Sequence, residues 1–349
     1  MRKIYTFWKR VVIFSAVLCV ILHCINKILT PKYLYEDTWP TTATYTEFYK
    51  LKDNSVDVFF LGSSNAAAGF IPQELYNNYG ITSYNLGCEQ QSMLVSYYWL
   101  EEALRTQSPQ VIILDCLMLF PFGDMGVLNS SEECTRKALD YMKLGRTKRE
   151  AVDAICGLDE TLSEESFYFT NIRYHTRWKE LSVKDFSIDK IAESGQLKGY
   201  APLFGKGNNE TWCPFEDKGE MEGCHEMNPV MREYFCKIAE LCRQQDIILI
   251  MVKTPTTDEY IGKYNGLKLI AQEQGLVFLD FNEEKMYEQL EFVYSLDMND
   301  DAHCNISGAA KLTNFMGKYL VEKKLVEEIG KYDPQWEKTK EYYGSISVN

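Results

Sequence analysis

Five short apolar segments recur along the chain, and most are separated by stretches with apolar residues at helical spacing. Segments that are apolar at nearly every position are typical of strands buried on both faces of a parallel sheet. Strand and helix in alternation predict an α/β fold with one parallel five-stranded sheet between two layers of helices. In such sheets the ligand site lies beyond the carboxyl ends of the strands. The predicted strands are residues 56–61, 83–86, 111–114, 247–252 and 276–280, and the predicted helices are residues 90–104, 231–242, 260–274 and 307–325.

Residues 120–228 interrupt this alternation, because they separate the third and fourth strands by far more chain than a crossover needs. We interpret them as a mostly helical insertion and expect it to cover the ligand-binding edge of the sheet. The insertion contains helical patterns at 132–144 and 148–156, an aromatic segment at 167–178 and a Gly/Asn-rich loop at 205–209.

The N-terminal region has a different pattern, with an apolar run at residues 11–25 that is preceded only by basic charges. The run is almost long enough to cross a bilayer, and basic residues before it favour a cytoplasmic N-terminus. We therefore expect residues 1–30 to be a transmembrane signal anchor, residues 31–52 a stalk, and residues 53–349 an extracytoplasmic domain. A cleaved signal peptide is less consistent with the sequence, since no small-residue cleavage pattern follows the run. A buried helix is the third interpretation. The basic residues are Arg2, Lys3, Lys9 and Arg10.

Composition narrows the classes of function. The net charge of -13 disfavours nucleic-acid partners, and 46% hydrophobic with 25% charged residues is normal for a packed globular protein. The eleven cysteines include no C-x-x-C pair and no spacing typical of a zinc site. The rest of the sequence gives no evidence for a metal or an organic cofactor, so we expect neither. Cys213 and Cys224 flank a polar loop, where they either pair outside the cell or remain free thiols.

Two separated motifs follow predicted strands and carry candidate chemistry. Ser64 comes directly after the first strand, where a tight turn exposes a hydroxyl and nearby N–H groups face an oxyanion. Asp300 and His303 follow the last strand, and their spacing lets the carboxylate reach one ring nitrogen while the other accepts the serine proton. Asp297 and Asp301 are rivals for the role of Asp300 in the same acidic loop. Ser64, His303 and Asp300 are therefore the candidate catalytic residues.

These motifs resemble the conserved blocks of SGNH/GDSL hydrolases. Residues 62–64 (Gly-Ser-Ser) resemble the first block, with a serine in the place of the family's aspartate, and residues 300–303 (Asp-x-x-His) resemble the last. The resemblance implies a flavodoxin-like three-layer α/β/α fold. Segments at 136–148, 174–178, 198–200 and 252–255 look like an envelope-anchored branch of the superfamily found in gut Firmicutes. That branch is distantly similar to the D-alanyl transfer proteins of teichoic acid operons and to alginate O-acetylation proteins.

The resemblance also implies an oxyanion hole. Gly87, in the Asn-Leu-Gly that follows the second strand, matches the glycine of the second block, and its N–H would act with that of Ser64. A turn glycine is the simpler reading of Gly87. The third block departs from the family, because Asp115 stands where an asparagine is expected and an ionised carboxylate cannot donate. Asn65 is a candidate substitute.

Several charged and aromatic residues are tentative substrate ligands. His175, Arg177 and Trp178 in the insertion suit an acyl donor or an anionic polymer, or they pack the insertion against the sheet. Lys253, at the end of the fourth strand, either binds substrate or neutralises the acidic loop around Asp300. Arg136 and Lys148 are weaker candidates.

The expected function is an extracytoplasmic serine esterase or O-acyltransferase that acts on acyl esters, acetyl in the first place, of a cell-surface glycan or glycopolymer. Transfer of acyl groups across the membrane would require a multi-pass membrane acyltransferase as partner, since the chain has a single apolar run. The alternatives are a non-catalytic binding protein with the same fold and an accessory subunit of a polymer-modifying complex.

Overall fold

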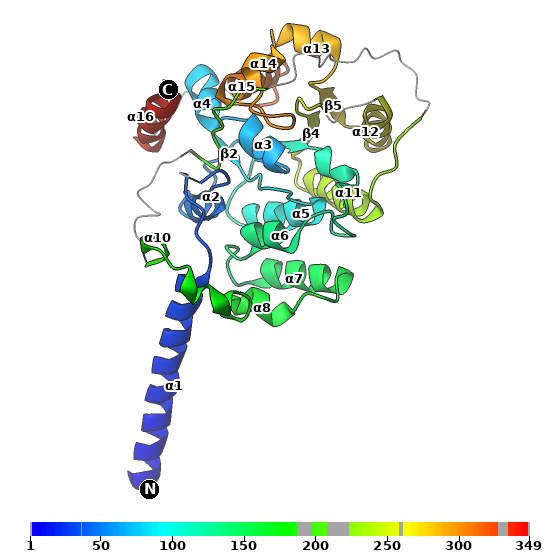
Figure 1. Cartoon of the computed structure of the whole chain (residues 1–349). Helices are drawn as coiled ribbons and strands as arrows, with labels where there is room; N and C mark the ends of the chain where they lie inside the picture. Colours follow the sequence, from blue (N-terminus) through cyan, green and yellow to red (C-terminus); the bar gives the residue numbers. More distant parts are fainter. Residues whose placement is uncertain are drawn as a thin grey trace.

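The computed structural model describes residues 2–35, 37–186, 197–207, 223–257, 261–326 and 334–347. Its centre is a five-stranded parallel sheet in the order β2-β1-β3-β4-β5, which is the flavodoxin-like order and confirms the predicted fold class (Figure 1). Every residue of β1 and β3 is buried, as expected for strands covered on both faces. The strands are β1 (Val58–Leu61), β2 (Ser83–Asn85), β3 (Val111–Asp115), β4 (Ile248–Lys253) and β5 (Val277–Asp280).

Side chains of the strands alternate between two apolar layers. Phe59 and Leu61 belong to one buried cluster, and Val58 and Phe60 belong to the other. This follows from the period of two in a strand, which sends neighbours to opposite faces. The first layer includes α2 (Thr41–Phe48), α5 (Met93–Ala103), α7 (Arg146–Leu158), α11 (Pro229–Gln244) and α12 (Ile261–Gln274), and the second includes α4 (Pro72–Tyr79), α13 (Glu284–Gln289) and α15 (Ile306–Glu322).

Polar side chains begin three of the long helices. Ser92 accepts a hydrogen bond from the Val95 N–H at the start of α5, and Asn228 caps α11 in the same way. Asn305 caps α15 by accepting from the N–H groups of Ser307 and Gly308. Such caps satisfy the N–H groups that lack a partner within the helix. The remaining helices are α3 (Ser64–Gly69), η1 (Leu117–Leu119), α14 (Tyr294–Asp297) and α16 (Pro334–Ser347).

The described part of the insertion is mostly helical, but its helices do not lie over the carboxyl ends of the strands. Helix α7 packs on α5, while α9, η2 and α10 pack against the N-terminal helix α1 (Arg2–Leu29), on the side of the domain that faces α1 (Figure 1). The later residues 197–207 do run along the edge of the sheet, where Gly199 approaches the Asn85 carbonyl too closely for any side chain. The insertion helices are α6 (Glu132–Leu139), α7, α8 (Glu164–Tyr168), α9 (Thr170–Tyr174), η2 (His175–Lys179) and α10 (Val183–Phe186).

Residues 31–52 are part of the folded domain, so the prediction of a stalk is wrong. Helix α2 lies in this segment, and Tyr45 stacks on Trp99 with ring centroids 4.2 Å apart. Phe48 is buried in the same cluster. The physical reason is that the aromatic residues of α2 complete the apolar layer over β1 and β2, which a flexible stalk would leave open.

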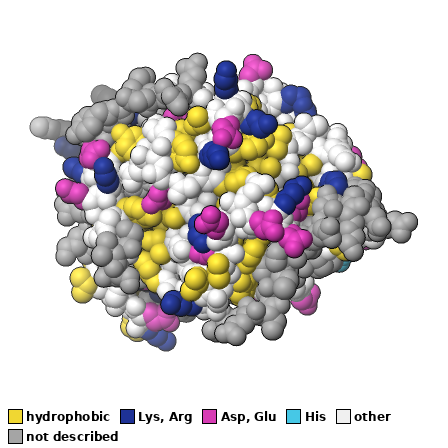
Figure 2. Space-filling model, turned by 90° about the horizontal axis from the view of Figure 1, so that it is seen from above, with side chains coloured by type: hydrophobic (Ala, Val, Ile, Leu, Met, Phe, Trp, Pro, Cys, Tyr) yellow, Lys and Arg dark blue, Asp and Glu magenta, His cyan; other side chains and the backbone are white. Residues whose placement is uncertain are grey.

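Helix α1 projects away from the domain as a single rod (Figure 1). The span Ile4–Leu29 contains an 18-residue window with a mean hydropathy of 2.3 and is long and apolar enough to cross a membrane. On the face opposite α1, basic and acidic side chains of the described residues are interspersed among apolar ones (Figure 2). The described residues of that face therefore form no large patch of a single sign.

Candidate active site

Ser64 occupies the turn between β1 and α3, at the carboxyl edge of the sheet. Gly62 has a φ of 137°, and a Cβ at this position would lie 2.8 Å from the Cβ of Asp115. Only glycine fits such a turn without strain. Ser63 is the N-cap of α3, so Ser64 is the first helical residue. The turn thereby places the Ser64 hydroxyl at the carboxyl edge of the sheet, where the loop between α14 and α15 also lies.

His303 and Asp300 meet Ser64 from the other end of the chain. Ser64 Oγ lies 2.9 Å from His303 Nε2, and His303 Nδ1 lies 2.9 Å from Asp300 Oδ1. Asp300 Oδ1 also accepts hydrogen bonds from the backbone N–H groups of Ala302 and His303, which fixes the turn. The structure thus brings the three candidate catalytic residues into one hydrogen-bonded chain.

The two rival carboxylates have other partners. Asp297 pairs with Lys311 at 2.8 Å and accepts a hydrogen bond from Ser307 Oγ. Asp301 accepts a hydrogen bond from the Tyr294 hydroxyl. Among the described carboxylates, only that of Asp300 lies within ion-pair distance of His303.

The charge of Asp300 is stabilised by its surroundings. Partial burial raises the pKa of this carboxyl, but the hydrogen bond and charge of His303, with bonds from Ala302 and Asn299, more than offset that and hold it well below its usual range. An ionised Asp300 accepts the Nδ1–H of the imidazole, which leaves Nε2 as the acceptor for the Ser64 proton.

We expect Asp300→Asn to be less stable than wild type, by an amount that depends on pH. Because the pKa of Asp300 is lower in the folded than in the unfolded protein, its ionised form stabilises the fold at pH values above the unfolded pKa of about 3.9. This stabilisation is lost as the pH falls toward the pKa of Asp300 in the folded protein. The difference in unfolding free energy between wild type and Asp300→Asn should therefore be largest near neutral pH and shrink below about pH 4. Urea unfolding at several pH values measures it, and a difference that does not change with pH would contradict the assignment.

Trp39 is a site residue that the sequence did not identify. Its ring lies 5.1 Å from the His303 ring, centroid to centroid, at a tilt of 54°. Trp39 belongs to the segment between α1 and α2, which joins the N-terminal helix to the domain. An aromatic ring from the segment that follows the apolar helix therefore lies beside the candidate base. A tryptophan between prolines looks like part of a linker, so no local signal marked its role.

We expect Trp39→Ala to reduce kcat/KM for ester substrates by roughly 3- to 10-fold, because an aromatic pair contributes about 0.5–1.5 kcal/mol to the position of the imidazole. Trp178→Ala is the matched control, since Trp178 is 64% exposed and lies in η2 beside α1. Steady-state kinetics on an aryl acetate measure both variants. Equal rates in wild type and Trp39→Ala would show that the ring does not serve the site.

The oxyanion donors differ from expectation. The Ser64 N–H has no acceptor within α3, because it belongs to the first residue of the helix, and it remains a candidate donor. The Gly87 N–H instead donates to Asn85 Oδ1 at 3.0 Å. Both hydrogens of the Asn65 side-chain amide are used, on Thr254 Oγ1 and on the Ala302 carbonyl. The structure therefore does not place Gly87 or Asn65 as free oxyanion donors.

Asn85 and Thr254 make hydrogen bonds that hold the segments around Ser64 in place. The sequence did not identify either of them as a site residue. The Asn85 amide donates to the carbonyls of Ala66 and Phe70 and so holds α3 against the end of β2. Asp115 is fully buried and accepts hydrogen bonds from the N–H and the hydroxyl of Thr254, both at 3.1 Å. Asp115 thus acts as an acceptor that orders the turn after β4 rather than as an oxyanion donor.

Lys253 and Arg136 are buried structural residues, so the prediction that they bind substrate is wrong. Lys253 is fully buried at the end of β4. Burial raises the pKa of Asp115, and the charge of Lys253 opposes this rise. Arg136 in α6 pairs with Glu132 at 2.7 Å and lies 4.0 Å over the ring of Phe167 in α8. Both cations therefore compensate buried polar groups.

His175, Arg177 and Trp178 lie beside the end of α1 and not at Ser64. Arg177 donates to the Leu29 carbonyl at 3.0 Å and pairs with Asp185 at 2.7 Å. His175 is exposed, with Nδ1 2.9 Å from the Ile172 carbonyl. Cations at a helix C-terminus satisfy its free carbonyls. The packing interpretation therefore fits Arg177, with α1 rather than the sheet as its partner, whereas Trp178 is exposed.

Two expectations concern metals and cysteines. The described residues contain no group of three or more His, Cys, Asp or Glu side chains that could hold a metal ion. The pairing of Cys213 with Cys224 lies outside the described residues, because Cys213 is not among them.

Comparisons with known proteins give only weak similarity. No family model matches the chain, and no match was found among curated proteins. Among solved structures, a protein from Bacteroides fragilis assigned as an acylhydrolase has 11% identity and a TM-score of 0.36, covering 81% of this chain and 95% of that chain. A GDSL-like lipase from Bacteroides thetaiotaomicron has 12% identity and a TM-score of 0.34, covering 81% of this chain and 98% of that chain. These values are too low to assign the chain to a family.

Proposed function

We propose that the chain is a serine hydrolase or acyltransferase of the SGNH/GDSL type, with Ser64 as nucleophile, His303 as base and Asp300 as the residue that orients the imidazole. One observation supports this most strongly. Two hydrogen bonds of 2.9 Å connect Ser64 Oγ to His303 and His303 to Asp300. Residues from both ends of the sequence converge on this geometry, which is that of an activated serine.

The proposed reaction has two steps. Ser64 Oγ attacks the acyl carbonyl while its proton passes to His303 Nε2, and the Ser64 N–H stabilises the oxyanion. Collapse of the tetrahedral intermediate returns the proton to the leaving alkoxide and leaves an acyl ester on Ser64. Water or a sugar hydroxyl then attacks this ester, with His303 again taking and returning one proton. Attack by water gives an esterase, and attack by a sugar gives an O-acyltransferase.

The proposed location is the outer face of the cell membrane, with α1 as an uncleaved anchor and the N-terminus in the cytoplasm. The apolar span Ile4–Leu29 and the basic residues at its start support this orientation. A site tethered to the membrane by α1 fits acyl esters, acetyl in the first place, on a cell-surface glycan or glycopolymer. Acyl transfer would in addition require a multi-pass membrane partner that carries acyl groups outward.

A second candidate is a non-catalytic binding protein or an accessory subunit of a polymer-modifying complex. The oxyanion site favours it, since the Gly87 N–H is bonded to Asn85 and Asp115 replaces a donor. One donor stabilises an oxyanion less than three, because each removed donor typically costs about 2.7–4 kcal/mol of transition-state stabilisation.

The proposed chemistry is tested by measuring whether an acyl group is transferred to water or to a sugar. The full-length protein in neutral detergent is given an aryl acetate with and without a glycan oligosaccharide, and free acetate and O-acetyl sugar are measured by mass spectrometry. Acetate alone indicates an esterase, and O-acetyl sugar that requires Ser64 indicates a transferase. Release of aryl alcohol at equal rates by wild type and Ser64→Ala would reject both and favour the binding protein.

A further inference from the structure

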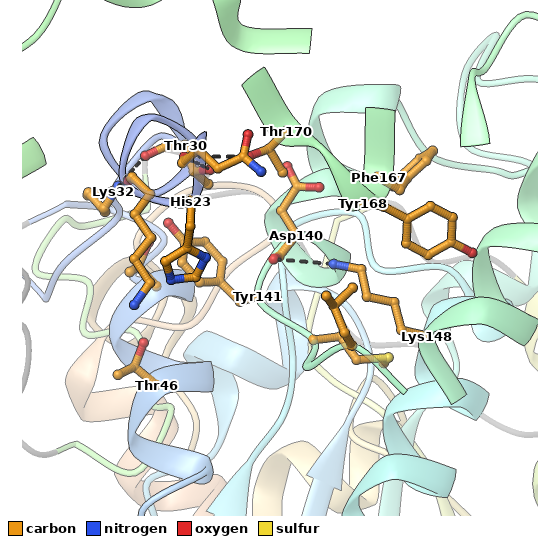
Figure 3. Close-up of a pocket in the computed structure, with 15 residues that line it drawn as sticks. His23, Thr30, Lys32, Thr46, Asp140, Tyr141, Lys148, Phe167, Tyr168 and Thr170 are labelled. Carbon is orange, nitrogen blue, oxygen red and sulfur yellow. Dashed lines mark hydrogen bonds between the residues drawn. The ribbon is translucent and has the colours of Figure 1, made fainter. Parts of the chain in front are cut away.

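A cavity of about 360 Å³ lies between the end of α1, helix α2 and the insertion helices α6 to α8. Its walls come from parts of the chain that are far apart in sequence. His23 and Lys27 belong to the last turns of α1, Thr46 to α2, and Lys148 and Phe167 to the insertion. Figure 3 shows His23, Thr46, Lys148 and Phe167 around a common space. The cavity is separate from Ser64 and serves no step of the proposed reaction.

Most of the cavity's lining is apolar, and its few charged side chains are mainly cationic. Three lysines, Lys27, Lys32 and Lys148, line the cavity together with one carboxylate, Asp140. That carboxylate already has partners, since Asp140 Oδ1 lies 3.6 Å from Arg136 and Oδ2 accepts a hydrogen bond from the Tyr174 hydroxyl. Asp185, which does not line the cavity, acts on Lys32, and the two carboxylates together still carry less charge than the three ammonium groups. The cavity therefore favours an anionic ligand.

Of the two buried lysines in this group, Lys148 has the weaker hydrogen bond. Its side chain is only 3% exposed, and the hydrogen bond that Nζ makes in the described structure is a long one of 3.4 Å to the Asp140 carbonyl (Figure 3). Burial lowers the pKa of Lys148 to about 8, and the charge of Asp140 opposes this effect. A buried ammonium group normally requires an anionic or strongly accepting partner. An anion in the cavity would supply it.

The position of the cavity along α1 indicates where that anion comes from. Helix α1 exposes large apolar side chains such as Phe14 and Val20 over most of its length, and His23 and Lys27 follow them. In a helix that crosses a bilayer, polar residues after the apolar run lie at the depth of the lipid headgroups. The cavity begins at this level.

The insertion beside the cavity carries a second sign of a membrane surface. Five large apolar side chains of α9, η2, α10 and the preceding loop are exposed, around the same end of α1. Hydrogen bonds fix this segment to α1, with Thr170 Oγ1 2.7 Å from Thr30 Oγ1 and the Asn171 N–H donating to Asn26. Exposed aromatic and aliphatic side chains next to a span are typical of the membrane interface. They are Phe169, Ile172, Trp178, Val183 and Phe186.

We propose that this cavity binds the phosphate group of an anionic phospholipid headgroup in the leaflet that contacts the domain, with Lys148 as its main charged ligand. The proposal rests on the membrane location proposed above and is independent of the chemistry at Ser64. The bound headgroup and the five exposed apolar side chains together would hold the domain in one orientation on the bilayer. Ser64 would then face substrates at a fixed height above the membrane.

Lipid retention by the full-length protein tests this proposal. The protein is placed in phosphatidylcholine nanodiscs with and without phosphatidylglycerol, and the lipids retained after release are counted by native mass spectrometry. Wild type should retain phosphatidylglycerol in preference to phosphatidylcholine. Lys148→Met should lose this preference by roughly tenfold, as expected for one charge-assisted hydrogen bond, and Lys148→Arg should restore part of it. Lys285→Met is the matched control, because Lys285 is an exposed lysine on α13.

The other outcomes reject the proposal in distinguishable ways. Equal retention of both lipids by a protein that is inserted in the nanodisc would reject the headgroup site alone. Failure to insert would reject the membrane location together with the site, while leaving the reactivity of Ser64 to be judged separately. Inorganic phosphate that raises the unfolding temperature of the detergent-solubilised wild type as much as short-chain phosphatidylglycerol would assign the cavity to a free anion. Circular dichroism and thermal unfolding show whether Lys148→Met is folded.

Discussion

Ser64→Ala is expected to reduce the hydrolysis of an aryl acetate by roughly 10³-fold or more, and His303→Ala by a similar factor. The reason is that the serine and the histidine act as a unit, with Ser64 Oγ and His303 Nε2 2.9 Å apart. The double variant should therefore be no worse than either single variant, because removing one member already disables the other. Steady-state rates of the four proteins measure this coupling.

Ser108→Ala is the matched control for that experiment. Ser108 is an exposed serine whose hydroxyl donates to Asn54, on a loop before β3. Its replacement should leave the rate unchanged. Losses that multiply in the double variant of Ser64 and His303 would show that the two residues act separately, which the geometry does not allow.

Arg136→Leu is expected to destabilise the fold by about 3–5 kcal/mol, which is the usual cost of removing one partner of a buried ion pair. Arg136 is 2% exposed, and its loss would leave the buried Asp140 with less compensation. It would also remove the hydrogen bonds that join α6 to Ser166 in the middle of α8. Urea unfolding measures the change in the free energy of unfolding.

The control for this prediction is Arg146→Leu, because Arg146 is exposed and pairs weakly with Glu150 at 3.9 Å. It should change stability by less than about 0.5 kcal/mol. An Arg136→Leu protein with unchanged stability and a raised KM would contradict the structural role and would return Arg136 to the substrate site.

The sheet could be predicted because each strand carries its own signal. Strand β3 is apolar from Val111 to Leu114 and is bounded by polar residues, so the local pattern alone reveals a buried strand. The parallel arrangement followed from the helices between strands. The catalytic loops could be placed because Ser64 directly follows β1, and Asp300 and His303 lie between the last strand and the last long helix, so both motifs are expected at the carboxyl edge of the sheet.

The course of the chain between α1 and β1 could not be predicted in the same way. Helix α2 is short and rich in threonine, and such a segment has no periodic apolar face that marks burial. Its place is decided by Tyr45 and Phe48, which fill space beside Trp99 that only the folded sheet creates. Trp39 reaches His303 for the same reason, since a contact between residues so far apart in sequence depends on the whole fold.

The charged residues were misread because charge alone does not indicate burial. Lys253 ends a strand, a position that commonly faces a ligand, yet the neighbouring strands bury it beside Asp115. The Gly87 N–H also has a local competitor, because Asn85 two residues earlier turns its side chain back to accept it. These are tertiary or conformational effects that spacing in the sequence does not encode.

Labelling by a fluorophosphonate tests the central claim most directly. The full-length protein in neutral detergent is treated with the probe, and the modified peptide is mapped by mass spectrometry. We predict one phosphonylated residue, Ser64, and a loss of labelling in His303→Ala, because the probe reacts only with a serine whose proton a base can accept. A folded wild-type protein that is not labelled at Ser64, or labelling that persists in His303→Ala, would contradict the account.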